Sequence, residues 1–224
     1  MTTHPPPEPA TAAEPGLPGR LREARANDAA VLKAAREVFA RRGPDASIAD
    51  IAKLAGVGVG SIYRRYATKE DLVEALHVHG VLAAAAMADE IADTGPIDDT
   101  GAVGTFIARQ IREIDGPPLQ PSGAQSGLLP EALAEASERL GGALRRLVDL
   151  DLAARLIPEG FTTADAMQLM LHVRPRLPLP PADARALHLR YLSFALAGLR
   201  AHAGLGTPVA PGPRWEEWVR AWHE

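Results

Sequence analysis

Residues 47–72 carry the pattern that most constrains the fold, because a glycine-rich turn there joins two short helical stretches. Ser47, with an aspartate three residues later, forms a capping box and predicts the start of an amphipathic helix. Gly56 is expected to end this helix in a left-handed conformation that costs a glycine little. A second helix of about seven residues is predicted from Val59. Two short helices joined by so tight a turn predict a compact helical module.

The glycines of "GVGVG", residues 56–60, also raise the alternative of a phosphate-binding loop in a nucleotide enzyme. Such a loop needs G-x-G-x-x-G directly after a buried strand, whereas the third glycine here comes one residue too early. The preceding residues, "SIADIAKLA", have the pattern of a capped amphipathic helix. No G-x-x-x-x-G-K-[ST] occurs in the chain. Spacing and context therefore both favour a helix–turn–helix.

The second short helix is predicted to present hydrogen-bond donors to solvent. Ile62 and Tyr66 are four residues apart and are expected to point inward. A step of about 100° per residue then turns a polar set outward. The outward residues are Gly60, Ser61 and Arg64, with Tyr63 on the flank. This set offers hydroxyl and guanidinium donors and no acid, which suits a surface that meets phosphates.

Lys69 stands at the first position of the next predicted helix, which Thr68 and Asp71 open with a second capping box. The helix macrodipole disfavours a cation there by a few tenths to about 1 kcal/mol. Backbone amides together with an ammonium group make a phosphate site at such a helix start. The alternative is that Glu70 and Asp71 neutralise Lys69 on a solvated surface. The neighbouring tyrosine and arginine favour the phosphate role.

The rest of the chain predicts further helices, so the expected fold class is all-α. Apolar residues at three- and four-residue spacing begin near Asn27 and end at Gly43-Pro44. The helix that starts at Thr68 is expected to run to about residue 92, and no run of alternating β-branched residues demands a strand. Residues 1–19, rich in Pro and Ala, are expected to form a disordered tail. The later helical stretches are 98–114, 130–156, 162–173, 182–203 and 213–223.

Charge is distributed unevenly along a chain whose formal net charge is −4. Residues 20–70 hold eleven Lys/Arg and six Asp/Glu, whereas residues 71–224 hold thirteen Arg and twenty acids. A small basic module on a larger acidic body predicts that one end meets a polyanion. Chance clustering of surface charge is the alternative.

Composition argues against several other classes of function. The absence of cysteine excludes disulfides, thiol catalysis and thiolate metal sites. The seven histidines share no metal-ligand spacing, and carboxylates such as Asp149 and Asp151 are expected on a solvated face. No metal, cofactor or enzymatic activity is therefore predicted. Without an apolar run of roughly 18 residues or a signal core, the chain is expected to be cytoplasmic and not membrane-bound.

Residues 27–76, "NDAAVLKAAREVFARRGPDASIADIAKLAGVGVGSIYRRYATKEDLVEAL", resemble the N-terminal domain of the TetR family of transcriptional regulators. The residues that carry the resemblance are Ala35, Phe39, Gly43, Ile51-Ala52, Ala55-Gly56-Val57, Gly60-Ser61-Ile62-Tyr63, Tyr66 and Lys69. The resemblance implies an N-terminal three-helix helix–turn–helix DNA-binding domain, residues 20–68. A larger helical effector-binding and dimerisation domain, residues 69–224, would follow it. The implied function is a homodimeric repressor that binds double-stranded operator DNA and is released by a small-molecule effector.

Carried over by position, the resemblance assigns DNA contacts to the turn and the helices beside it. The residues implied to touch phosphates are Ser61, Tyr63 and Lys69, with Ser47 meeting the backbone at the first helix's start. The residues implied to face the groove are Val59, Gly60, Arg64 and Arg65.

The chain departs from the family's frequent polar residues at Gly58 and Val59. Valine can meet a thymine methyl group but donates no hydrogen bond, so base readout is thinner than usual. Arg64 and recognition of the shape of the duplex must then account for more of the sequence specificity. The residues that could add contacts in a minor groove are Arg20, Arg22 and Arg25.

In the C-terminal half, helix 182–203 is predicted to form half of a four-helix dimer interface together with residues 164–173. Its apolar residues lie almost all round the helix. The core of one chain can cover only one side of it, so a second partner must cover the apolar residues on the other side. Leu192 and Leu196 are expected at this interface, and a helix at the centre of a monomeric bundle is the alternative. The effector pocket should be mostly apolar. The residues assigned to it, each equally compatible with plain core, are Met87, Phe106, Gln110, Met167 and Met170.

Two functions of other classes stay open on sequence alone. One is a helical small-molecule-binding protein or enzyme with no DNA role, whose basic end is only surface. The other is an architectural DNA binder without an effector. Retention of DNA by the ligand-free protein separates the first of these from a regulator.

Overall fold

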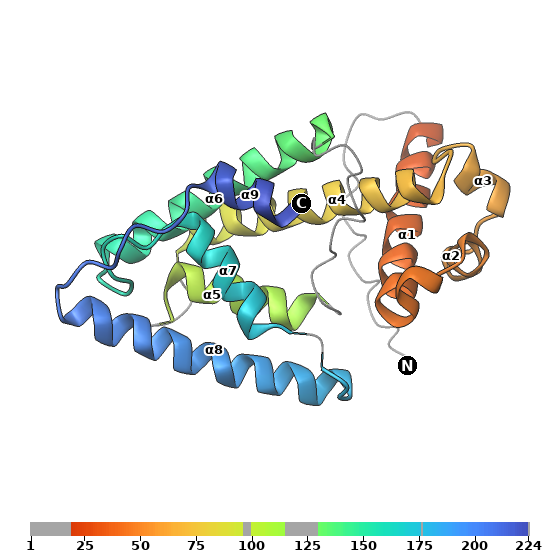
Figure 1. Cartoon of the computed structure of the whole chain (residues 1–224). Coiled ribbons are helices and arrows are strands. Elements are labelled where there is room, and N and C mark those ends of the chain that lie inside the picture. The colour runs from red at the N-terminus through yellow and green to blue at the C-terminus, as the bar shows by residue number, and fades with distance from the viewer. Residues whose placement is uncertain (1–18, 96–99, 115–129, 176, 224) are drawn as a thin grey trace, which may run out of the picture.

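The computed structural model describes residues 19–95, 100–114, 130–175 and 177–223, and every regular element within them is a helix (Figure 1). The all-α prediction is confirmed. The helices are α1 (Gly19–Arg42), the 3₁₀ turn η1 (Gly43–Asp45), α2 (Ile48–Ala55), α3 (Val59–Tyr63), α4 (Lys69–Thr94), α5 (Gly101–Glu113), α6 (Glu131–Ala153), α7 (Thr163–Val173), α8 (Pro181–Gly204) and α9 (Trp215–His223).

The capping signals in the sequence set the helix boundaries of the N-terminal module. The Ser47 hydroxyl accepts the Asp50 N–H at 3.1 Å, which opens α2. Gly56 ends α2 with φ of 70°, a left-handed conformation that favours glycine. Thr68 and Asp71 form a complete capping box at the start of α4. α3 ends at Tyr63, a few residues earlier than predicted.

The predicted start of the first helix near Asn27 is wrong, because α1 begins at Gly19. The added residues include Arg, Leu, Glu and Ala, which have high helix propensity. Hydrophobic periodicity marks only the part of a helix that packs on a core, so it does not locate the first residue of the helix. The tail expected at residues 1–19 lies, apart from Gly19, outside the described residues.

Two hydrophobic cores are joined by α4. The first lies between α1, α2, α3 and the start of α4, and includes Ile51, Ile62 and Leu72, each at most 2% exposed. The second contains the later part of α4, with Ala85, Ala88 and Ile91. Figure 1 shows α4 running from the module at one end of the molecule into the body, where it lies along α6. A displacement of α4 in the body therefore has a direct route to the N-terminal module.

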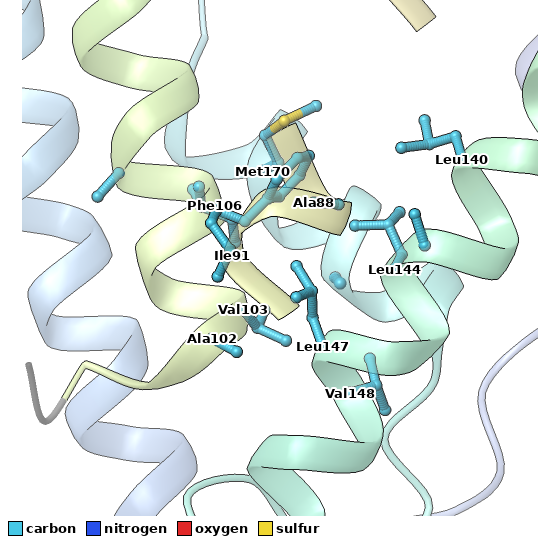
Figure 2. Packing of buried hydrophobic residues seen from close by; sticks show 14 of the residues in the cluster. Ala88, Ile91, Ala102, Val103, Phe106, Leu140, Leu144, Leu147, Val148 and Met170 are labelled. Carbon is cyan, nitrogen blue, oxygen red and sulfur yellow. The ribbon is translucent and has the colours of Figure 1, made fainter. Parts of the chain in front are cut away.

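The core of the body is built from large aliphatic side chains around Phe106 of α5 (Figure 2). α6 contributes Leu140, Leu144, Leu147 and Val148 to it. Outside this core, Arg146 of α6 binds two acids of α4, Asp89 at 3.1 Å and Asp93 at 2.5 Å. Packing and ion pairs together fix the second half of α4 to the body.

Asp151 was expected on a solvated face, and the structure shows instead that it is 2% exposed. Its carboxylate accepts the N–H groups of Ala102 at 2.7 Å and Val103 at 3.0 Å. These amides open α5 and have no partner within their own helix. Gly101, with φ of 80°, leaves room for the carboxylate, since a Cβ there would lie 2.7 Å from it. Asp149, two residues earlier, is exposed as expected.

α4 is long and apolar enough to cross a membrane, with a mean hydropathy of 1.3 over an 18-residue window. The expectation that no stretch approaches this length is therefore wrong. Leu72 and Leu76 are buried in the first core, and Ala85, Ala88 and Ile91 in the second. Such burial is typical of a core helix in a globular protein.

Candidate nucleic-acid interface

Most of the residues predicted to bind DNA lie in or beside α2, α3 and the first turn of α4, and they are exposed or half-buried. We call Ser47, Val59, Gly60, Ser61, Tyr63, Arg64 and Lys69 the reading surface, after their predicted role. Val59 is 40% exposed and Tyr63 50% exposed, although both are large. The inward residue of the same helix, Ile62, is 2% exposed. The predicted division of α3 into an inward and an outward face is confirmed.

Ser61 and Arg64 act as one polar unit on this surface. The Arg64 Nη2 donates to the Ser61 Oγ at 3.1 Å, and both residues are exposed. The remaining guanidinium donors of Arg64 can still reach a phosphate or a base edge. This bond fixes the Arg64 side chain relative to Ser61.

Arg65, which was predicted to face the groove, is paired with an acid of α1. Its guanidinium forms an ion pair with the carboxylate of Asp28 on α1. An arginine that is paired in this way ties the end of α3 to α1 and keeps only part of its donor capacity for another anion. No local pattern in the sequence predicts this pair. A first helix that starts near residue 27, as predicted, makes Asp28 its cap and gives no reason to expect an ion pair there.

Ser47 is held by an aspartate of its own helix. Its hydroxyl donates to the Asp50 carboxylate at 2.7 Å, and Arg42 binds the same carboxylate at 2.7 Å. The hydrogen bond from Ser47, and then the charge of Arg42, hold the pKa of Asp50 below its usual value. A phosphate contact through the Ser47 hydroxyl proton would therefore have to displace Asp50.

Lys69 lies at the start of α4, as predicted, with its Nζ 5.7 Å from the centre of the Phe39 ring. Asp71 is engaged with the backbone N–H of Thr68 at 3.0 Å. Because this bond leaves the carboxylate charged, neutralisation of Lys69 by Glu70 and Asp71 stays an alternative to the phosphate role. A cation at the start of α4, together with the first amides of that helix, favours a phosphate there.

Arg36 was missed by the sequence analysis, although it connects α1 to α4. It lies on α1 against Gly80 of α4, where a Cβ would come 2.8 Å from its Nη2. Burial lowers the pKa of Arg36. Gly80 was the available signal, because a glycine inside a long helix often marks close packing.

The residues assigned to an effector pocket are distributed through the core of the body. Phe106 and Met170 are 1% and 5% exposed, and Met167 is partly buried. Gln110, which is 4% exposed, donates its amide N–H to the Met87 sulfur at 3.6 Å. A thioether is a weak acceptor. Gln110 is thus a buried polar group with a weak partner in apolar surroundings.

An open groove of about 530 Å³ lies elsewhere, between α7, α8 and the segment that follows α8. Its lining includes Phe161, Leu169, Ala195, Gly198 and Val209, and none of the five residues assigned to the effector pocket. Across the residues that the structure describes, no group of three His, Asp or Glu could hold a metal ion.

A helix–turn–helix module with an exposed donor surface, joined by one helix to a larger helical body, defines the class of DNA-binding regulators. The family model for "Bacterial regulatory proteins, tetR family" matches residues 31–76. The TetR transcriptional regulator SCO0520 from Streptomyces coelicolor superposes with a TM-score of 0.57 at 25% identity, covering 77% of this chain and 98% of that one. FadR from Bacillus subtilis, solved in complex with stearoyl-CoA, shares the fold with a TM-score of 0.53 at 17% identity, covering 80% of this chain and 98% of that one.

Curated relatives agree with this class. Over 135 residues the chain is 37% identical to the HTH-type transcriptional repressor Rv3405c of Mycobacterium tuberculosis and to the HTH-type transcriptional regulator Mb3439c of Mycobacterium bovis. The match covers 57% of this chain and 64% of each relative. Residues 31–76 thus match the N-terminal domain of the TetR family, and most of the chain shares the fold of a TetR transcriptional regulator. The match confirms the resemblance seen in residues 27–76.

Proposed function

We propose that the chain is a homodimeric transcriptional repressor in the cytoplasm that binds operator DNA through the reading surface and is released by a small-molecule effector. The observation that carries the proposal is the exposed donor set on α3, in a segment that has no acid from residue 57 to residue 69. DNA backbone recognition depends on such donors and on the absence of like charge.

The DNA part rests on how the reading surface is built. Tyr63 and Ser61 offer hydroxyl groups, and Arg64 and Lys69 offer cations, all from one short stretch of chain. Hydroxyl and ammonium contacts to phosphates would fix the register of the domain. The guanidinium of Arg64 then has the geometry to bind the edge of a guanine.

The dimer part rests on the two faces of α8. Leu192 and Leu196 were expected at the interface, but they are 3% and 6% exposed within one chain. Leu196 packs on α5, where a Cβ on Gly104 would lie 2.7 Å from its Cδ1. Tyr191 and Phe194 face outward instead, 57% and 54% exposed. We assign the interface to this outer face.

A second copy suits the outer face of α8 because the face contains both projections and a hollow. The rings of Tyr191 and Phe194 stand 6.1 Å apart, edge to face. The groove beside them includes Ala195 and Gly198, and a Cβ on Gly198 would meet no atom within 4 Å. A two-fold dimer needs one surface that is complementary to itself.

The effector part rests on α4 and on Gln110. An effector bound near Gln110 would contact Met87 of α4, and α4 continues to Lys69 on the reading surface. The Arg36–Gly80 contact adds a second link between α4 and the DNA-binding domain. An effector shifts the equilibrium only by its differential affinity for the two positions of α4. The stearoyl-CoA bound by FadR belongs to that protein and leaves the effector class here open.

The test is selection of duplexes from a random-sequence library, followed by titration of the enriched and a scrambled duplex. We expect enrichment of a two-fold symmetric sequence and preferential binding to it at physiological salt. Arg145→Ala, which removes an exposed arginine from α6, is the control and should leave binding unchanged. No DNA binding would indicate a protein without a DNA role, and binding without enrichment would indicate an architectural DNA binder.

A further inference from the structure

Glycines stand on both sides of Val59 at the start of α3. Within Gly58-Val59-Gly60, Val59 is therefore the only residue with a side chain. A Cβ added to Gly58 or to Gly60 would meet nothing within 4 Å, so both positions beside the valine face open space. The valine itself is 40% exposed. Its two methyl groups therefore project from this end of the helix without a polar neighbour at either adjacent position.

The arginines that follow α3 are partly engaged with protein groups. Arg64 donates to Ser61 at 3.1 Å, and Arg65 is ion-paired with Asp28. The first residues of a recognition helix are those that contact base edges in the major groove. Bases are usually read by a hydrogen-bond donor or acceptor. At Val59 the chain offers an apolar group instead.

We propose that Val59 reads the 5-methyl group of a pyrimidine in the major groove. This inference rests on the proposed function and names the feature of the DNA that the site selects. Thymine carries such a methyl group and cytosine does not. Uracil differs from thymine only by this group, and 5-methylcytosine places a methyl group at the same ring position. The preferred duplex therefore has a 5-methylpyrimidine opposite Val59 in each half-site.

The experiment replaces each thymine of the enriched operator duplex by uracil, one position at a time, in both half-sites. For the wild-type protein we expect one position at which uracil weakens binding about fourfold, which corresponds to about 0.8 kcal/mol for one methyl group. The Val59→Ala variant should bind the thymine duplex more weakly and show no further loss with uracil. A 5-methylcytosine–guanine pair at this position should bind better than a cytosine–guanine pair.

The matched control is Leu54→Ala, which shortens another exposed apolar side chain, on α2, without flanking glycines. This variant should keep the full uracil penalty. The inference is overturned if the operator binds specifically but no thymine is sensitive to uracil, or if Val59→Ala keeps the penalty. It is also overturned if Leu54→Ala abolishes the penalty as Val59→Ala should. Failure to enrich any sequence is a different result, which refutes the proposed function and this inference together.

Discussion

The indole ring of Trp215 lies directly against Gly141 of α6, where a Cβ would come 2.4 Å from the indole nitrogen. The indole N–H donates to the Ser137 carbonyl at 3.1 Å, one helical turn before the glycine. Trp218 stacks on Trp215 with ring centres 5.4 Å apart. The missing side chain at position 141 thus allows α9 to dock on α6.

Gly141→Ala is expected to destabilise the protein, because the new methyl group would overlap a buried ring and overpacking costs about 1–3 kcal/mol. Gly142→Ala is the matched control, since a Cβ there meets nothing within 4 Å. The control should gain up to about 1 kcal/mol from helix propensity. Urea unfolding followed by tryptophan fluorescence measures both, and equal effects would contradict the packing of α9 on α6.

Asp151→Asn is expected to leave stability nearly unchanged below the unfolded pKa of aspartate, because a protonated carboxyl and an amide each offer one carbonyl oxygen to the two N–H groups of α5. Burial raises the pKa of Asp151, and the hydrogen bonds from Ala102 and Val103 lower it by less. The folded state therefore binds the proton more tightly than the unfolded state. Stability from this group is greatest below the unfolded pKa of about 3.9 and is lost as pH rises through the folded-state pKa.

The stability of the wild-type protein should consequently fall relative to that of Asp151→Asn as pH rises from about 3.9 through the folded-state pKa of Asp151. Denaturant unfolding of the two proteins at matched pH values cancels the titration of all other groups. A wild-type protein that instead gains stability relative to the variant as pH rises would mean that the hydrogen bonds from Ala102 and Val103 outweigh burial at this carboxylate.

Local signals in the sequence predict local structure well here, and long-range contacts explain the errors. The caps at Ser47 and Thr68 and the left-handed Gly56 depend on residues within one helical turn, so the N-terminal module follows from sequence. Asp151 caps a helix that lies 48 residues earlier in the chain, which no local pattern reveals. The Arg65–Asp28 ion pair also joins residues that are distant in the chain, so no local pattern predicts it.

The error at α8 has a different cause. A helix that is apolar on all sides is expected to pack against its own chain on one face and against a second partner on the other. Periodicity does not show which face packs on the chain's own core. Leu192 and Leu196 lie in the core of the body, where α8 contacts α5 and α7, and Tyr191 and Phe194 are left exposed.

Tyr191→Glu combined with Phe194→Glu is expected to give monomers that remain folded, since both residues are more than half exposed in one chain. Charge repulsion across a two-fold axis would oppose association. Analytical ultracentrifugation measures the mass, and circular dichroism checks the fold. Leu192→Glu, the contrasting variant, should unfold the body instead, because it buries a charge. A double variant that stays dimeric would place the interface elsewhere.

Lys69→Ala and Tyr63→Phe are expected to weaken binding to operator and scrambled duplexes by similar factors. Both groups are assigned to phosphates, and phosphate contacts carry no base information. Lys69→Ala should also lower the slope of log K against log salt by about one unit, whereas Tyr63→Phe should leave the slope unchanged. Fluorescence anisotropy titrations over a range of salt concentrations measure this. A loss confined to the operator duplex would reassign the residue to base recognition.

Arg64→Ala and Arg65→Ala are adjacent and remove the same group, so their comparison isolates the role of orientation. Arg64 is exposed and bonded only to Ser61 among the described residues, so it is free to read a base. Its loss should reduce discrimination between operator and scrambled DNA by roughly 1–3 kcal/mol. Arg65 is bound to Asp28, so its loss should act on stability and leave discrimination nearly unchanged. Paired titrations on both duplexes, with thermal unfolding of each variant, separate the two outcomes. If Arg64→Ala weakens both duplexes equally, Arg64 is a phosphate anchor, and if Arg65→Ala alone loses discrimination, the groove-facing arginine is Arg65.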